Sequence, residues 1–108
     1  MHFELWSQMS SVAQIVQKVR SKNAGPFWLT IDIFCGSQLA YAQITESIST
    51  ERVAILFQTT PDQIKRFDIV DLNVVKFSLP RPTIQGSLTD RDMHGAGWAP
   101  LIAELDIN

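Results

Sequence analysis

The sequence contains few of the residues that form disulfides or metal sites. Cys35 is its only cysteine, so no disulfide can form within the chain. The two histidines and the cysteine stand at positions 2, 94 and 35, a spacing that matches no metal-binding motif. A single cysteine is typical of a reducing compartment. We therefore expect a cytoplasmic protein with no bound metal and no cofactor.

Long hydrophobic runs and an excess of positive charge are also missing. Polar residues interrupt every apolar stretch, so we expect no membrane association. Residues 1–6 lack the basic start and long apolar segment of a signal peptide. The formal net charge of −2 and the pI of about 5.5 argue against a nucleic-acid binder, because such a protein presents a basic surface.

The remaining composition is that of a folded domain. Hydrophobic residues make up 45% of the 108 residues and charged residues 19%, which allows a buried core. We predict one domain over residues 1–108, made of an N-terminal extension at 1–9 and a folded α+β unit at 10–107.

Hydrophobic spacing predicts a helix and then a strand in the first third of the chain. Ser11 and Gln14 match a capping box, and the apolar residues that follow recur at helical spacing, so we expect a helix over residues 10–20. Gly25-Pro26 ends any helical continuation. Apolar residues alternate from 27 to 34, which predicts a strand.

Further along, the patterns predict two helices, a hairpin and a closing strand. One helix is expected after Gly36-Ser37 and a shorter one from about Thr50, followed by a single helical turn at residues 60–63. The remaining predicted strands cover residues 64–70, 74–79 and 102–107.

Residues 83–97 show no apolar period and predict a long loop. Four strands with helices after the first predict an α+β fold. The order β-α-β-β-(short helix or loop)-β matches a ferredoxin-like plait, an antiparallel four-stranded sheet with helices on one face. The second crossover helix of the plait would be shortened or replaced by the long loop.

The junction at residues 20–27 is the strongest candidate for a binding site. Cations, a hydroxyl, an amide and a glycine are concentrated here, and such groups together bind carboxylates or phosphates. The alternative is an ordinary helix cap and turn. Arg81, which stands between two prolines, suits either a ligand clamp or a structural salt bridge. The predicted anion-binding residues are Arg20, Ser21, Lys22, Asn23, Gly25 and Arg81.

Acidic residues and a histidine supply weaker candidates for catalysis. Asp32 lies in the middle of a predicted strand, where it is either exposed or paired with Lys22, Arg81 or Arg91. His94 has the right pKa range for a general acid or base, although a loop histidine is more often solvated. Asp90 and Asp92 begin like a calcium loop, but the glycine and glutamate spacing of that motif is absent.

Two stretches of the chain resemble a small bacterial family of unknown function. They are Arg-Ser-Lys-Asn-Ala-Gly-Pro-Phe at 20–27 and Leu-Pro-Arg-Pro at 79–82, with the Gly-Ser-Leu-Thr-Asp-Arg-Asp segment that follows. The family is encoded beside, or fused behind, proteins of the acyclic-terpene-utilisation type, and the resemblance runs from about residue 12 to 107. Residues 50–57 and 67–77 are distantly similar to the ferredoxin-fold domain at the C-terminus of those larger proteins.

The resemblance implies an accessory role in catalysis. Members of the family look like small subunits of two-component cytoplasmic enzymes that act on carboxylic acids or acyl-CoA thioesters, with hydro-lyase or isomerase chemistry. The implied partners are a larger acyclic-terpene-utilisation-type protein and a small anionic substrate. This chain carries His94 where the family often has a tyrosine, and Trp98 near a common glutamine–histidine pair.

Two other interpretations remain open. The chain is alternatively a non-catalytic homo-oligomeric module that binds small molecules, with aromatic residues filling the contact between copies. The third interpretation is a stand-alone enzyme that uses Asp90, Asp92 and His94. Neither the substrate nor the reaction follows from the sequence.

Overall fold

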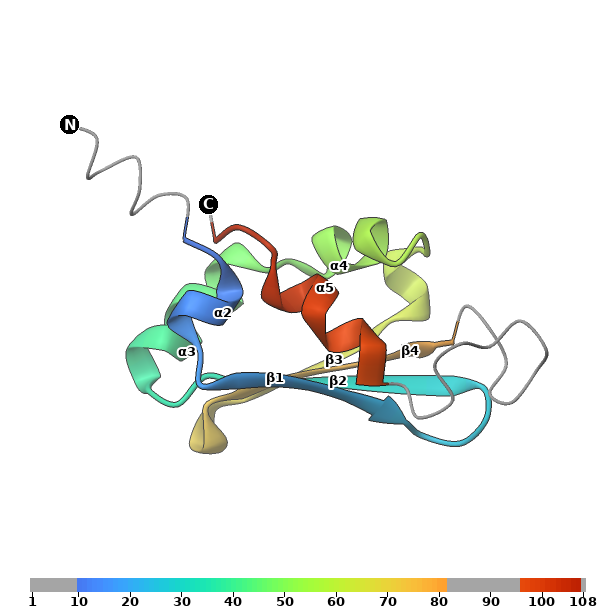
Figure 1. Ribbon diagram of the computed structural model, residues 1–108, viewed down its shortest axis with the longest axis horizontal. Helices are drawn as coiled ribbons and strands as arrows, with labels where there is room; N and C mark the ends of the chain where they lie inside the picture. The colour runs from blue at the N-terminus through green and yellow to red at the C-terminus, as the bar shows by residue number, and fades with distance from the viewer. Residues whose placement is uncertain (1–9, 82–95, 108) are drawn as a thin grey trace.

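A computed structural model describes residues 10–81 and 96–107 of the chain (Figure 1). One four-stranded sheet carries helices α2, α3, α4 and α5 on one side, with the strands in the order β1-β2-β4-β3 and every neighbouring pair antiparallel. The strands are β1 (Lys18–Asn23), β2 (Trp28–Phe34), β3 (Lys65–Ile69) and β4 (Val74–Pro80). The helices are α2 (Val12–Ile15), α3 (Gln38–Ser47), α4 (Thr50–Leu56) and α5 (Ala99–Ala103).

The two helices between β2 and β3 begin where the sequence predicts them. The Ser37 side chain accepts a hydrogen bond from the backbone N–H of Ala40 and caps α3, and Ser49 caps α4 through the N–H of Arg52. A short 3₁₀ turn at Pro61–Gln63 precedes β3, as predicted. The predicted hairpin is also confirmed, and its turn ends at a left-handed residue, Asn73 (φ 53°).

The predicted helix over residues 10–20 is wrong beyond its first turn. Helix α2 ends at Ile15, and residues 18–23 form the edge strand β1 instead. The apolar residue Val19 fits both patterns, because it lies seven residues after Val12 and also alternates with Lys18 and Arg20. Pairing with β2 over six residues decides the outcome, since a strand can extend the sheet here and a longer helix cannot.

The predicted closing strand at 102–107 is wrong as well. This segment contains the end of α5, and its only β pairing is an isolated bridge between Asp106 and Ser11. Pro100 stands in the first turn of α5, a position that suits proline, and Ile102 is fully buried. The first predicted strand is thus β2, and β1 supplies the fourth strand.

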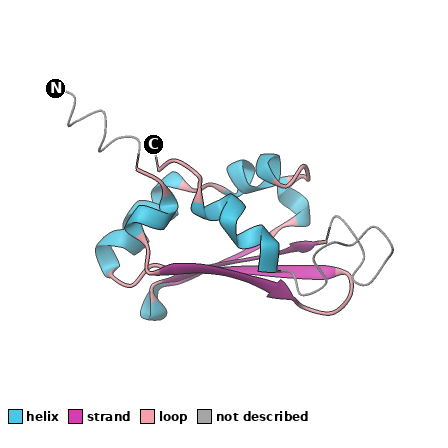
Figure 2. Cartoon of the chain, in the orientation of Figure 1, coloured by secondary structure: helices cyan, strands magenta, loops and turns pink. Residues whose placement is uncertain are grey.

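The predicted α+β class and four-stranded antiparallel sheet are confirmed, but the predicted chain order is not. The strands and α-helices follow one another as α-β-β-α-α-β-β-α, with two hairpins in the sheet (Figure 2). No helix among the described residues is long and apolar enough to cross a membrane.

The core lies between the sheet and the helices. Alternate residues of β2 and β4 face the helices and are fully or almost fully buried there; they are Leu29, Ile31, Ile33, Val75, Phe77 and Leu79. Among the described residues no helix covers the opposite side of the sheet, which we call the open face (Figure 1). Its residues are Lys18, Arg20, Lys22, Trp28, Thr30, Asp32, Phe34, Lys65, Phe67, Ile69, Val74, Lys76 and Ser78.

Candidate functional site

The predicted anion-binding residues do not form one site. Because residues 18–23 form a strand rather than a helix end and turn, their side chains alternate between the two sides of the sheet. Arg20 and Lys22 project on the open face, whereas Ser21 and Asn23 project toward the helices. The structure therefore separates the predicted cluster into two groups on opposite faces.

The helix-side group is part of the framework of the fold. The buried Ser21 hydroxyl accepts a hydrogen bond of 2.9 Å from the backbone N–H of Ala99, the first residue of α5. The Arg81 guanidinium donates to the Asn23 side-chain oxygen. The backbone N–H of Arg81 donates to the carbonyl of Phe27 over 2.8 Å. These contacts hold β1, β4 and α5 together.

Gly25 belongs to the turn between β1 and β2. Its φ of +81° lies in the left-handed region that favours glycine, and a Cβ added there would meet no atom within 4 Å. The backbone N–H of Ala24 donates to the carbonyl of Trp28 and closes the turn. The conformation of the turn is thus enough to explain the glycine.

Cations gather on the open face. The strand register places Lys22, Thr30, Ser78 and Lys65 in one row across the four strands. The next two rows are Arg20, Asp32, Lys76 and Phe67, then Lys18, Phe34, Val74 and Ile69. Five cations thus share this face with one carboxylate, although the whole chain has a net charge of −2.

Asp32 lies at the centre of this face and is 7% exposed. The Asp32 carboxylate forms an ion pair with Arg20, with 3.9 Å between Nη2 and the carboxylate oxygen, and the register also places Asp32 beside Lys76. This ion pair joins Asp32 to Arg20 rather than to the predicted partners Lys22 or Arg81, and the third predicted partner, Arg91, lies outside the described residues. Flanking cations on both neighbouring strands instead balance the carboxylate.

Aromatic rings hold several of the cations close to the sheet. The Lys18 ammonium lies 5.2 Å and the Arg20 guanidinium 5.8 Å from the centre of the Phe34 ring. The Lys65 ammonium lies 5.6 Å from the centre of the Trp28 ring. Such contacts attract a cation to the ring face and position its charge. The open face is therefore a cationic surface with apolar parts.

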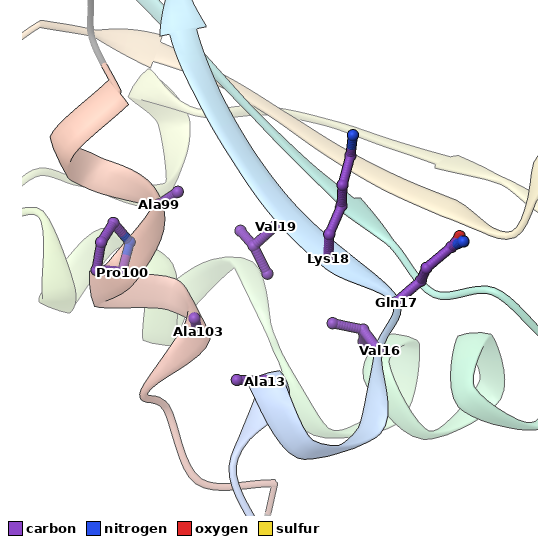
Figure 3. A pocket seen from close by; sticks show the side chains of 8 residues that line it. All are labelled: Ala13, Val16, Gln17, Lys18, Val19, Ala99, Pro100 and Ala103. Atoms are coloured by element: carbon purple, nitrogen blue, oxygen red, sulfur yellow. The ribbon is translucent and has the colours of Figure 1, made fainter.

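A cavity of about 430 Å³ lies on the other side of the sheet, near the end of β4. Its lining combines one guanidinium with amide and hydroxyl side chains; the lining residues are Phe57, Gln58, Thr59, Gln63, Pro80 and Arg81. A second hollow of about 460 Å³ lies between α2, β1 and α5. Figure 3 shows Val16 and Val19 pointing into this second hollow and Lys18 pointing away, so its floor is apolar.

Cys35 is a buried structural residue. Burial raises the pKa of its thiol to about 11, so the thiol is protonated at neutral pH and is a poor nucleophile. No group of three or more histidine, cysteine, aspartate or glutamate side chains suitable for a metal ion occurs among residues 10–81 and 96–107. The predicted residues His94, Asp90 and Asp92 lie outside the described residues.

Sequence reasoning did not include three cations of the open face, namely Lys18, Lys65 and Lys76. One signal was available in the alternation of Lys18, Arg20 and Lys22, which is typical of a strand with one charged face. The other two lysines join this face only through cross-strand pairing, which no local pattern reveals.

One family of proteins matches the sequence. The family model described as "Domain of unknown function (DUF4387)" covers residues 12–104. The chain belongs to this family. No curated protein and no solved structure matches the chain. The predicted resemblance to a small family of unknown function is confirmed in this form.

Proposed function

We propose that this DUF4387 protein is the small accessory subunit of a two-component cytoplasmic enzyme acting on a carboxylic acid or acyl-CoA substrate. The hydro-lyase or isomerase class comes from the resemblance noted in the sequence. One observation carries the proposal: five cations and one carboxylate share the open face of an otherwise acidic chain. Such a surface attracts anions because the potentials of neighbouring charges add.

The shape of the open face favours an accessory role. Small-molecule sites bury most of the ligand surface in a concave pocket. The open face is one side of a sheet, so a second chain is needed to enclose a substrate against it (Figure 1). The larger acyclic-terpene-utilisation-type protein is the proposed second chain, and its surface or its bound substrate would supply the negative charge.

Charge makes face-to-face pairing of two copies less favourable. Such a homo-oligomer would bring five cations against five others with only one carboxylate on each side. A homo-oligomeric binding module would have to use another surface, such as the helix side, where Leu39 and Ile55 are exposed.

We also infer a ferredoxin-like relationship for the fold. Strand β4 lies between β2 and β3, and helices α3 and α4 connect those two strands, which forms a split β-α-β unit. Strand β1 lies beside β2, where the last strand of a plait would lie, although it comes first in the chain. An experimental structure with β1 away from β2 would contradict this relationship.

Co-expression with the larger protein encoded nearby tests the function. We expect the two chains to co-purify and to turn over a carboxylate or acyl-CoA substrate together. Lys22→Gln combined with Lys76→Gln removes two positive charges from the open face, and should weaken the complex or raise its KM roughly tenfold, since each exposed charge pair contributes about 0.2–1 kcal/mol.

A matched control changes the charge of the helix side. Gln38→Glu combined with Gln43→Glu lowers the net charge by the same two units at exposed positions of α3, and should leave assembly and KM unchanged. Equal effects of the two pairs would show that only total charge matters. Failure of the chains to associate or to turn over substrate would reject the proposed function.

A further inference from the structure

The cavity near the end of β4 contains features that the proposed function does not use. It lies on the helix side of the sheet, between the end of α4 and the last residues of β4. Its volume of about 430 Å³ falls in the range typical of small-molecule sites. The open face, by contrast, lies on the opposite side of the sheet.

Arg81 supplies a fixed cationic wall of this cavity. The residue is 8% exposed, its guanidinium donates to Asn23, and its backbone N–H donates to Phe27. These contacts restrict the side chain. A planar guanidinium held in one orientation suits the two oxygens of a carboxylate or phosphate.

The other polar lining residues that the structure describes are neutral. Gln58, Thr59 and Gln63 contribute amide and hydroxyl groups, and no aspartate or glutamate occurs among the described residues that line the cavity. The described part of the cavity wall therefore carries positive charge, and its neutral groups can donate further hydrogen bonds to an anion. The Phe57 ring forms an apolar part of the wall and lies 5.7 Å from the Trp98 ring.

The backbone at Gln58 ends helix α4 and so sets the position of this part of the cavity wall. Its φ of 56° lies in the left-handed region, which is uncommon for residues other than glycine. Hydrogen bonds from the N–H of Gln58 to Ile55 and from the N–H of Thr59 to Ala54 hold this turn. These two hydrogen bonds form the Schellman motif, which commonly ends a helix at a left-handed residue. Gln58 is also a residue of the cavity wall.

We propose that this cavity binds a small oxyanion, a carboxylate or a phosphate, with Arg81 as the charged anchor. Gln58, Thr59 and Gln63 surround the bound oxyanion as neutral hydrogen-bonding groups. This site is separate from the cationic open face, and it operates whether or not the open face contacts a larger protein.

Nuclear magnetic resonance of the isotopically labelled full chain tests the site. Sodium propionate and sodium phosphate are titrated separately, with sodium chloride at matched ionic strength as the reference. We expect saturable shifts at the amides of residues 57–63 and 81 with one of the two anions, and the responding anion identifies the ligand class. Linear shifts in all three titrations, or no shifts in these residues, would overturn the proposal.

Variants separate this site from the open face. Gln63→Ala alters an exposed lining residue and should weaken anion binding several-fold, while the spectrum of the variant remains that of a folded protein. Arg81→Lys keeps the positive charge but removes the planar guanidinium that can contact two oxygens at once. The folded variant should bind the anion at least tenfold more weakly. Lys22→Gln combined with Lys76→Gln should leave this binding unchanged. The cavity site would be refuted if the open-face variant lost anion binding while Gln63→Ala bound the anion as tightly as the parent protein.

Discussion

Ser21 joins the edge strand to the last helix through one side-chain hydrogen bond. Its hydroxyl accepts from Ala99, whose N–H at the start of α5 has no partner within the helix. The hydroxyl is buried, so its loss leaves that N–H without an acceptor in an environment that water does not reach. The role of Ser21 in the described structure is thus to position α5.

Ser21→Ala should lower the free energy of unfolding by about 1–2 kcal/mol, the cost of an unsatisfied buried donor. Urea denaturation followed by circular dichroism measures this difference. Ser78→Ala, a half-buried serine on the open face, is the control and should change stability by less than about 0.5 kcal/mol. Equal losses in both variants would contradict a specific role for the Ser21–Ala99 bond.

At the scale of the elements, two glycines with left-handed backbone allow the ends of β2 to connect to their neighbours. Gly25 (φ +81°) lies in the turn before β2, and Gly36 (φ +84°) lies between β2 and α3. Only Gly36 is crowded, since an added Cβ would lie 3.2 Å from the Cβ of Gln17. An alanine at position 25 therefore introduces backbone strain alone, whereas an alanine at position 36 introduces backbone strain and a steric contact.

Gly25→Ala should destabilise the protein by about 1 kcal/mol, the cost of a left-handed conformation for a residue with a Cβ. Gly36→Ala should cost more, because the methyl group also displaces Gln17. Thermal and urea unfolding of both variants test this order. Gly25→Asn should lose less than Gly25→Ala, since asparagine tolerates this conformation. A larger loss of stability for Gly25→Ala than for Gly36→Ala would show that the contact with Gln17 does not add to the cost at Gly36.

At the scale of the whole molecule, charge is distributed unequally between the two sides of the sheet. Five of the nine lysines and arginines lie on the open face, whereas ten of the eleven aspartates and glutamates lie elsewhere in the sequence. A net charge near zero therefore conceals a strongly cationic surface. Association through such a surface weakens as salt screens its charges.

The protein should be retained on a sulfonate cation-exchange resin at pH 7 and low ionic strength, despite its net charge of −2. Lys22→Gln combined with Lys76→Gln should elute at clearly lower salt, because retention depends on the local cationic patch. The pair Gln38→Glu and Gln43→Glu should elute close to the parent protein. Passage of the parent protein straight through the resin would contradict a functional cationic face.

Local sequence patterns were sufficient for elements whose residues interact with near neighbours. The capping serines of α3 and α4, the proline of the 3₁₀ turn and the alternation in β2 and β4 each act within a few residues. They predicted the α+β class and most element positions correctly. Residues 18–20 and 102–107 were misassigned because their short patterns fit more than one structure, and contacts with β2 and the core decided between them.

The sequence by itself determined the composition of the candidate sites and the family, since residues 12–104 match DUF4387. Only the tertiary structure decided which charges share a surface. Side chains on a strand alternate between faces, so Arg20 and Ser21 are neighbours in the chain yet lie on opposite sides of the sheet. Lys22 and Lys65 lie in one row because four strands pair across the sheet, an arrangement that depends on long-range hydrogen bonding.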